Sequence, residues 1–132
     1  MSNIILDTNA YSLLRRGNVY IKKEILSSKA IYLSVISLGE LYNGFKIGSK
    51  EAINNRFLES FIKGKNTKII EITKKTAIFY GEISSYLIKK GTPIPTNDIW
   101  IAASAIETSS TLITYDKHFL NIPNLKLWGK IK

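Results

Sequence analysis

The chain has 132 residues, of which 45% are hydrophobic and 22% are charged, and it contains no cysteine. This length and composition predict a single globular domain over residues 1–132, and they exclude a disordered chain, a coiled-coil rod, a disulfide framework and a thiolate metal site. Nineteen Lys and Arg against ten Asp and Glu give a net charge of +9, which favours a polyanionic partner such as RNA or DNA.

Short apolar runs alternate with amphipathic helical patterns in the first half of the chain. Asp7 and Ser34, whose side chains can accept the free N–H groups of a helix start, follow two of these runs. The predicted elements are, in order, a strand at 4–6, helices at 9–16 and 19–28, a strand at 30–33, a helix between Ser34 and Gly48, and a helix at 51–62.

The second half of the chain continues this alternation. Gly91-Thr92-Pro93 ends one helical pattern, and Pro95-Thr96-Asn97 introduces the next. The predicted elements are a strand at 68–72, helices at 73–90 and 98–109, a strand at 111–114 and a short last strand at 126–128. Strands separated by helices imply right-handed crossovers. The predicted fold class is therefore α/β, with a parallel, roughly five-stranded sheet flanked by helices on both faces.

Neither a secretory leader nor a membrane span is expected. The first apolar stretch has no basic start and stops at Asp7. The longest later apolar run, at 99–103, is far shorter than the roughly 18 residues that a span needs. We therefore expect a cytoplasmic protein without a membrane association.

Four acidic residues fall at positions from which they can meet at one edge of the predicted sheet. Asp7 directly follows the first strand, and Glu40 lies in the helix that leaves the same edge after the second strand. Asp98 begins a helix that descends from this edge, and Asp116 follows the strand that returns to it. Since ligand sites in parallel sheets lie beyond the carboxyl ends of the strands, we expect these four carboxylates to converge there.

Such a cluster is stable in its ionised form only with a cation, because like charges raise one another's pKa in a partly dry cleft. Oxygen ligands without Cys or a pair of His favour Mg²⁺ or Mn²⁺ over zinc, and Mg²⁺ sites commonly include phosphate oxygens of the substrate. Structural alternatives remain open for each acid. Asp7 and Asp98 could be ordinary helix N-terminal residues stabilised by the helix dipole, Asp116 fits a turn, and a lysine could pair with Glu40.

With these acids in place, the sequence resembles the PIN-domain ribonucleases of the VapC toxin kind over nearly the whole chain. The matching segments are 5–9, 37–44, 95–103 and 112–119. The resemblance implies a single PIN-like domain that hydrolyses RNA with Mg²⁺ or Mn²⁺ as an endoribonuclease and leaves 5′-phosphate and 3′-hydroxyl ends. It also implies, for a toxin member, a cognate antitoxin protein as partner.

The resemblance also assigns roles to individual positions of this chain. The family's three metal-ligating acids correspond to Asp7, Glu40 and Asp98, and its more variable fourth acid corresponds to Asp116. Thr8 and Thr114 correspond to two hydroxyl positions near the metal.

Two positions depart from the pattern of this family. His118 stands where many relatives carry a second acid, and Tyr115 stands where Arg or Asn is common. We interpret His118 as an exposed loop histidine without a role, the alternative being a contact with phosphate. Lysines on the surface are expected either to guide the RNA backbone or simply to be solvated: Lys46, Lys50, Lys89, Lys90 and Lys117.

Two consecutive helices, between Ser34 and Gly48 and at 51–62, are rich in aromatic side chains. Their spacing predicts mostly core positions for Tyr42, Phe45, Phe57 and Phe61. Helices this apolar could also leave a groove for an antitoxin helix or for a second copy of the chain, so a homodimer is expected.

Other functions compete with this hypothesis. A PIN-type nuclease could act in RNA processing or DNA repair, and a non-catalytic basic module could bind nucleic acid without a metal. A receiver domain is excluded, because it needs an aspartate after its third strand, and Thr73-Lys74-Lys75 follows the third strand here.

Overall fold

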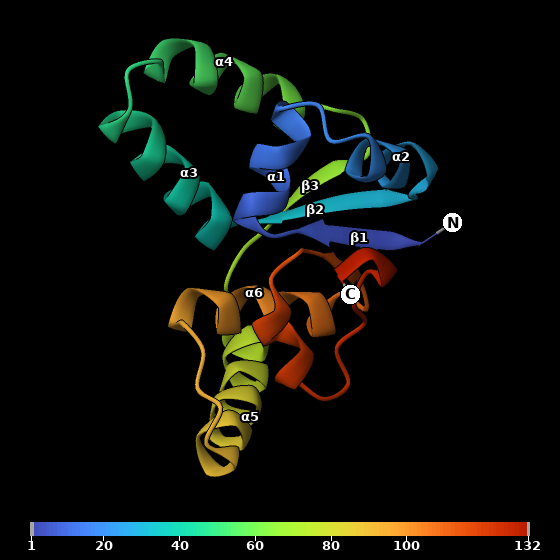
Figure 1. Cartoon of the computed structure of the whole chain (residues 1–132), viewed down its shortest axis with the longest axis vertical. Coiled ribbons are helices and arrows are strands. Elements are labelled where there is room, and N and C mark those ends of the chain that lie inside the picture. The colour runs from blue at the N-terminus through green and yellow to red at the C-terminus, as the bar shows by residue number, and fades with distance from the viewer. Residues whose placement is uncertain (1, 132) are drawn as a thin grey trace.

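The computed structural model describes residues 2–131, so Met1 and Lys132 of the predicted domain lie outside the described residues. Strands and helices alternate along this part of the chain (Figure 1). The elements are β1 (Asn3–Leu6), α1 (Thr8–Arg15), α2 (Val19–Ser27), β2 (Ala30–Ser34), α3 (Val35–Ile47), α4 (Glu51–Ile62), β3 (Thr67–Ile70), α5 (Lys74–Lys90), α6 (Thr96–Glu107), β4 (Thr111–Ile113), and two 3₁₀ helices, Lys117–Asn121 and Gly129–Ile131.

The four strands form one parallel sheet in the order β3-β2-β1-β4. Leu6 at the end of β1 lies opposite Leu33 in β2 and Ile113 in β4. The residues that follow these three positions therefore leave the sheet at the same edge. This register brings the start of α1, the start of α3 and the segment after β4 together, although they are far apart in the sequence.

The predicted α/β fold is confirmed, but the sheet has four strands within residues 2–131 and not five. The expected last strand at 126–128 is reduced to one isolated parallel bridge, between Leu127 and Leu112. Asn124, with a φ of 65°, turns the chain just before this segment, and the 3₁₀ helix at Gly129–Ile131 follows it directly. The segment is therefore too short for a second pair of residues to extend the ladder.

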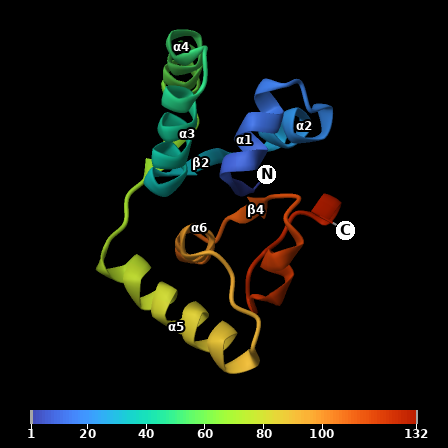
Figure 2. The same ribbon diagram turned by 60° about the vertical axis from the view of Figure 1, so that its left-hand side comes forward.

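Helices cover both faces of the sheet, with α1 to α4 on one side and α5 and α6 on the other (Figure 1). Figure 2 shows the same division from another direction. Successive residues of β1 alternate between the two cores, because strand side chains point to opposite faces. Ile4 and Leu6 pack with residues of α1 to α4, whereas Ile5 packs with α5 and α6.

The helix ends follow the capping residues of the sequence closely. Ser34 caps α3 through its side chain, and Gly91 ends α5 in the left-handed conformation. α6 starts at Thr96 and not at Asp98, because Pro95 takes the cap position and the following residues are already helical. Asp98 thus lies within the first helical turn. None of the described helices is both long and apolar enough to cross a membrane.

The aromatic residues of α3 and α4 are only partly in the core. Phe45 and Phe61 pack against the core on the α1 side, as expected. The core prediction is wrong for Tyr42 and Phe57, which are 38% and 47% exposed. The guanidinium of Arg15 lies 3.6 Å from the centre of the Phe57 ring and covers part of it.

Candidate metal centre

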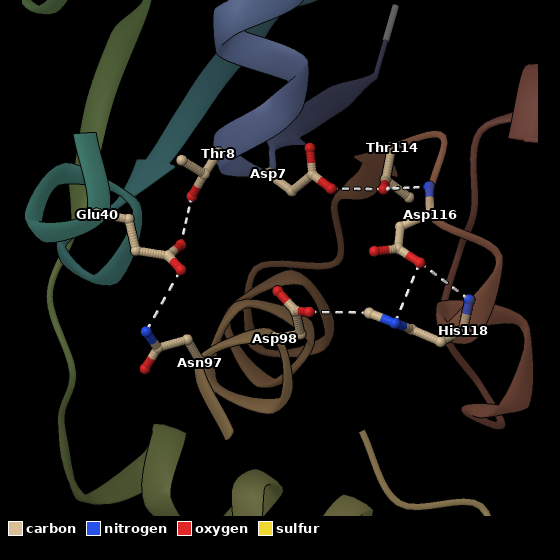
Figure 3. Close-up of polar contacts among 8 residues, drawn as sticks. All are labelled: Asp7, Thr8, Glu40, Asn97, Asp98, Thr114, Asp116 and His118. Carbon is tan, nitrogen blue, oxygen red and sulfur yellow. Dashed lines mark hydrogen bonds and ion pairs between the residues drawn. The ribbon is translucent and has the colours of Figure 1, made fainter. Parts of the chain in front are cut away.

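A cavity of about 310 Å³ opens at the sheet edge where β1, β2 and β4 end. All four acids singled out in the sequence line it, together with neighbours from α1 and α6. The lining residues are Asp7, Thr8, Asn9, Glu40, Pro95, Thr96, Asn97, Asp98 and Asp116. The convergence expected from the strand order is thus present in the fold, and Figure 3 shows how the four acids lie beside the side chains that contact them.

Asp7 lies at the base of the cavity and is 5% exposed. Its Oδ1 accepts a hydrogen bond from the Ala10 N–H (2.8 Å) and so caps α1, while its Oδ2 accepts one from the Thr114 hydroxyl (2.5 Å). Burial raises the pKa of Asp7 to about 6, and the nearby charges of Asp98 and Asp116 act in the same direction. The two hydrogen bonds oppose this rise without cancelling it.

Thr114 ties two of the acids together. This buried residue follows β4 directly, and its oxygen accepts a hydrogen bond from the Asp116 N–H (3.0 Å) while its hydroxyl donates to Asp7. The ends of β1 and β4 are therefore held in register by side chains as well as by the backbone. Thr114 therefore lies beside two of the acids, Asp7 and Asp116.

Glu40, on α3, faces the cavity and accepts two hydrogen bonds from neutral groups. The Thr8 hydroxyl donates to Oε1 (2.5 Å), and the Asn97 amide donates to Oε2 (3.4 Å). The alternative that a lysine pairs with Glu40 is wrong, because this carboxylate forms no ion pair within residues 2–131. Its negative charge therefore remains available to the cavity.

Asp98 and Asp116 are joined by the imidazole of His118 (Figure 3). His118 Nε2 lies 2.8 Å from Asp98 Oδ2, and Nδ1 lies 3.1 Å from Asp116 Oδ1. One possible ligand atom from each of these residues lies within 4.8 Å of the other two. The interpretation of His118 as an exposed residue is therefore wrong, since its side chain lies between Asp98 and Asp116 in the site (Figure 3).

The electrostatics of Asp98 differ from those of Asp7 because a basic group is in contact with it. Burial raises the pKa of Asp98, and the charges of Glu40 and Asp116 raise it further. The His118 ring opposes this rise through its charge and its hydrogen bond. One imidazole against four carboxylates still leaves the cavity acidic in a chain whose overall charge is positive.

Several of the structural alternatives are present at the same time as the cluster. Asp7 caps α1, and Asp116 Oδ1 accepts from the His118 N–H (3.3 Å) and caps the 3₁₀ helix. Capping uses one oxygen of each carboxylate, so it fixes the side chain and still leaves lone pairs that can bind a cation. The same residues can thus start a helix and line a metal site.

Sequence reasoning did not identify two contacts of this site, those made by Asn97 and His118. Asn97 directly precedes Asp98, and its position next to a candidate ligand was the available signal. The contact of His118 with Asp98 spans twenty positions and depends on the 3₁₀ helix after β4, which the residue pattern did not predict.

The donor set suits a small, hard divalent cation. Four carboxylates line the cavity and offer oxygen ligands, which Mg²⁺ and Mn²⁺ prefer, and the chain has no thiolate. Burial is the main cause of the raised pKa values of Asp7 and Asp98, and the charges of the neighbouring carboxylates add to it. A divalent cation in the cavity would offset these negative charges.

Comparisons with known proteins agree with the observed fold and identify a family. The model of the PIN domain family matches residues 4–125. The chain is 35% identical over 133 residues to a protein of Rickettsia felis named ribonuclease VapC2, with 96% of this chain and 98% of the relative covered. It is also similar to two solved structures. One is VapBC2 of Rickettsia felis bound to a DNA fragment from its promoter (TM-score 0.83, 32% identity, 96% of this chain and 97% of the other). The other is DNA-bound VapBC of Salmonella typhimurium (TM-score 0.85, 26% identity, 97% and 98% covered).

Proposed function

The chain belongs to the PIN domain family, and on that premise we propose that it is an endoribonuclease that hydrolyses phosphodiester bonds of RNA and acts as the toxin of a toxin–antitoxin pair. The observation that carries this proposal is the cavity lined by Asp7, Glu40, Asp98 and Asp116. The full-length similarity to a ribonuclease VapC2 supports RNA as the substrate.

The site residues that we propose are the four acids as ligands of Mg²⁺ or Mn²⁺. These four carboxylates would hold the cation, which would supply Lewis acidity: it would lower the pKa of the attacking water and offset the negative charge that develops on the phosphate. In this hydrolysis the bond between water oxygen and phosphorus forms, the bond to the 3′ oxygen breaks, and the products carry a 5′-phosphate and a 3′-hydroxyl.

The neighbouring side chains fix the orientation of the acids. Thr8 and Asn97 hold the two oxygens of Glu40, and Thr114 holds one oxygen of Asp7. His118 keeps Asp98 and Asp116 apart at a fixed spacing. Ligands that are oriented before the cation binds lose little freedom on binding, which strengthens the site.

We also propose a cognate antitoxin protein and a homodimer as the assemblies of this chain. The antitoxin is supported by the two similar structures, which carry the name VapBC, a family of toxin–antitoxin systems. The homodimer is supported by the exposed aromatic residues Tyr42 and Phe57 on α3 and α4. Light scattering of the purified chain tests the dimer, and a monomeric mass would contradict it.

Cleavage of labelled single-stranded RNA tests the proposed activity. The substrate is incubated with the protein in Mn²⁺, in Mg²⁺ and in EDTA, beside a DNA of the same sequence. We expect RNA cleavage that EDTA abolishes and that leaves 5′-phosphate ends. RNA that stays intact under all conditions would contradict an endoribonuclease, and cleavage of DNA alone would favour a role in DNA repair.

A further inference from the structure

A second cavity adjoins the metal centre on the side of α1 and β4, with a volume of about 490 Å³. It shares Asp7, Asn9 and Asp116 with the metal-centre cavity, so the two spaces lie side by side. Arg16, Tyr115 and Lys117 form much of its remaining polar wall. The proposed mechanism uses none of these three residues.

Tyr115 presents an aromatic ring in a fixed orientation next to the site. The residue is 38% exposed, and its hydroxyl accepts a hydrogen bond from the Asn18 side-chain amide (3.2 Å). Its ring packs edge to face on Trp128, with centroids 5.1 Å apart, and the Trp128 indole N–H is itself fixed by a bond to Glu24 (3.1 Å). A ring held in this way loses little freedom when a flat ligand stacks on it.

Arg16 and Lys117 add positive charge to the same cavity. Neither residue forms an ion pair within the part of the chain that the structure describes, whereas the exposed Lys46 pairs with Glu51 at 2.8 Å. Because no carboxylate among the described residues pairs with these two side chains, they can form ion pairs with phosphate groups of a nucleic acid. The cavity therefore combines an aromatic ring with two cations, directly beside the acids.

From this combination we propose that the second cavity is a nucleotide subsite for single-stranded RNA. Tyr115 stacks on the base next to the scissile phosphate, and Arg16 and Lys117 contact the adjoining phosphates. This subsite rests on the proposed function, because it takes the base next to a scissile phosphate that lies at the four acids. Every base has a stacking face, so the contact selects unpaired over paired RNA and does not select a particular base.

The binding of RNA is measured separately from its cleavage, in an Asp98→Asn parent protein with EDTA present. Fluorescence anisotropy gives the Kd of a short single-stranded RNA, of its duplex, and of an acidic peptide. We expect Tyr115→Leu to weaken single-strand binding about 5- to 150-fold, the range of one lost base stack. Tyr115→Phe is the matched control, since it keeps the ring and should bind close to the parent.

Two further measurements do not depend on the Leu variant. 2-Aminopurine placed beside the cleavage position should lose fluorescence on binding to the parent and to Tyr115→Phe, but not to Tyr115→Leu. The exposed substitutions Arg16→Gln and Lys117→Gln leave the core intact and should each reduce the slope of log Kd against log salt by about 0.7. A melting curve of each variant checks that it is folded.

The outcomes separate the subsite from the proposed function. If the wild-type protein cleaves RNA but Tyr115→Leu binds it as tightly as the parent and the salt slopes stay unchanged, the subsite is wrong and the nuclease assignment stands. Equal affinity for duplex and single strand would also overturn the stacking contact. If Tyr115→Leu weakened binding of the acidic peptide but not of RNA, the cavity would be a protein-binding site instead. A parent that binds no RNA would overturn the subsite, whereas a wild-type protein that leaves RNA intact in both Mn²⁺ and Mg²⁺ would overturn the proposed function.

Discussion

Thr114 donates a hydrogen bond to Asp7 across 107 positions of the sequence, and it does so in the interior of the protein. The same hydroxyl oxygen accepts the N–H of Asp116. This one side chain therefore connects a buried carboxylate at the end of β1 with a second acid beyond β4. A change at Thr114 should therefore affect both the stability of the fold and the position of two acids of the candidate metal centre.

Replacing Thr114 by Val, which has nearly the same shape, should lower the free energy of unfolding by about 1–3 kcal/mol at pH 8. The reason is that a buried carboxylate and a buried backbone N–H both lose a partner. Urea unfolding monitored by circular dichroism measures the change. Thr114→Ser keeps the hydroxyl and serves as the control. Equal stability of the Val variant and the wild type would show that the contact contributes nothing.

Asp7→Asn should stabilise the metal-free protein at neutral pH. The pKa of Asp7 is raised from 3.8 to about 6 in the folded state, so between these values the folded chain binds more protons than the unfolded chain. Stability therefore falls as the pH rises from about 4 to about 7, by up to about 3 kcal/mol at about 1.4 kcal/mol per pH unit. The neutral Asn keeps the cap of α1 without this cost.

Unfolding in EDTA at pH 4 and at pH 8 checks this prediction. The advantage of the Asn variant over the wild type should be larger at pH 8, whereas added Mg²⁺ should stabilise only the wild type. An advantage that is the same at both pH values would mean that Asp7 titrates normally in the folded protein.

Asp98→Asn should lower the rate of RNA cleavage by at least about 100-fold while the melting temperature stays the same or rises. Loss of a group that merely supports a metal ligand already costs up to about 100-fold, and a direct ligand should cost no less. Burial raises the pKa of Asp98, so its neutral replacement does not destabilise the fold. Single-turnover cleavage with purified protein provides the measurement, and an undiminished rate would remove Asp98 from the site.

The sequence predicted the parts of this site that depend on local rules. Asp7 follows a short apolar strand, and Glu40 lies two turns into a helix that leaves the sheet after the next strand. Because parallel strands end at one edge, these two positions were sufficient to expect convergence. Asp7 is also buried and caps α1, so the structural and the functional pattern coincide at this residue.

The features that the sequence did not predict depend on contacts between distant segments. Leu127 makes a single bridge to Leu112, and its number of pairs is set by the turns on either side and not by its own apolar character. His118 reaches Asp98 only because a 3₁₀ helix reverses the chain after Asp116. Neither arrangement leaves a periodic pattern in the residues themselves.

Diffraction from a crystal soaked in Mn²⁺, recorded where manganese scatters anomalously, tests the central claim most directly. We expect an anomalous peak in the cavity, in contact with carboxylate oxygens of Asp7, Glu40, Asp98 or Asp116, and its loss in Asp98→Asn crystals. A fully soaked crystal with no peak in this cavity, or with manganese bound only at other residues, would contradict it.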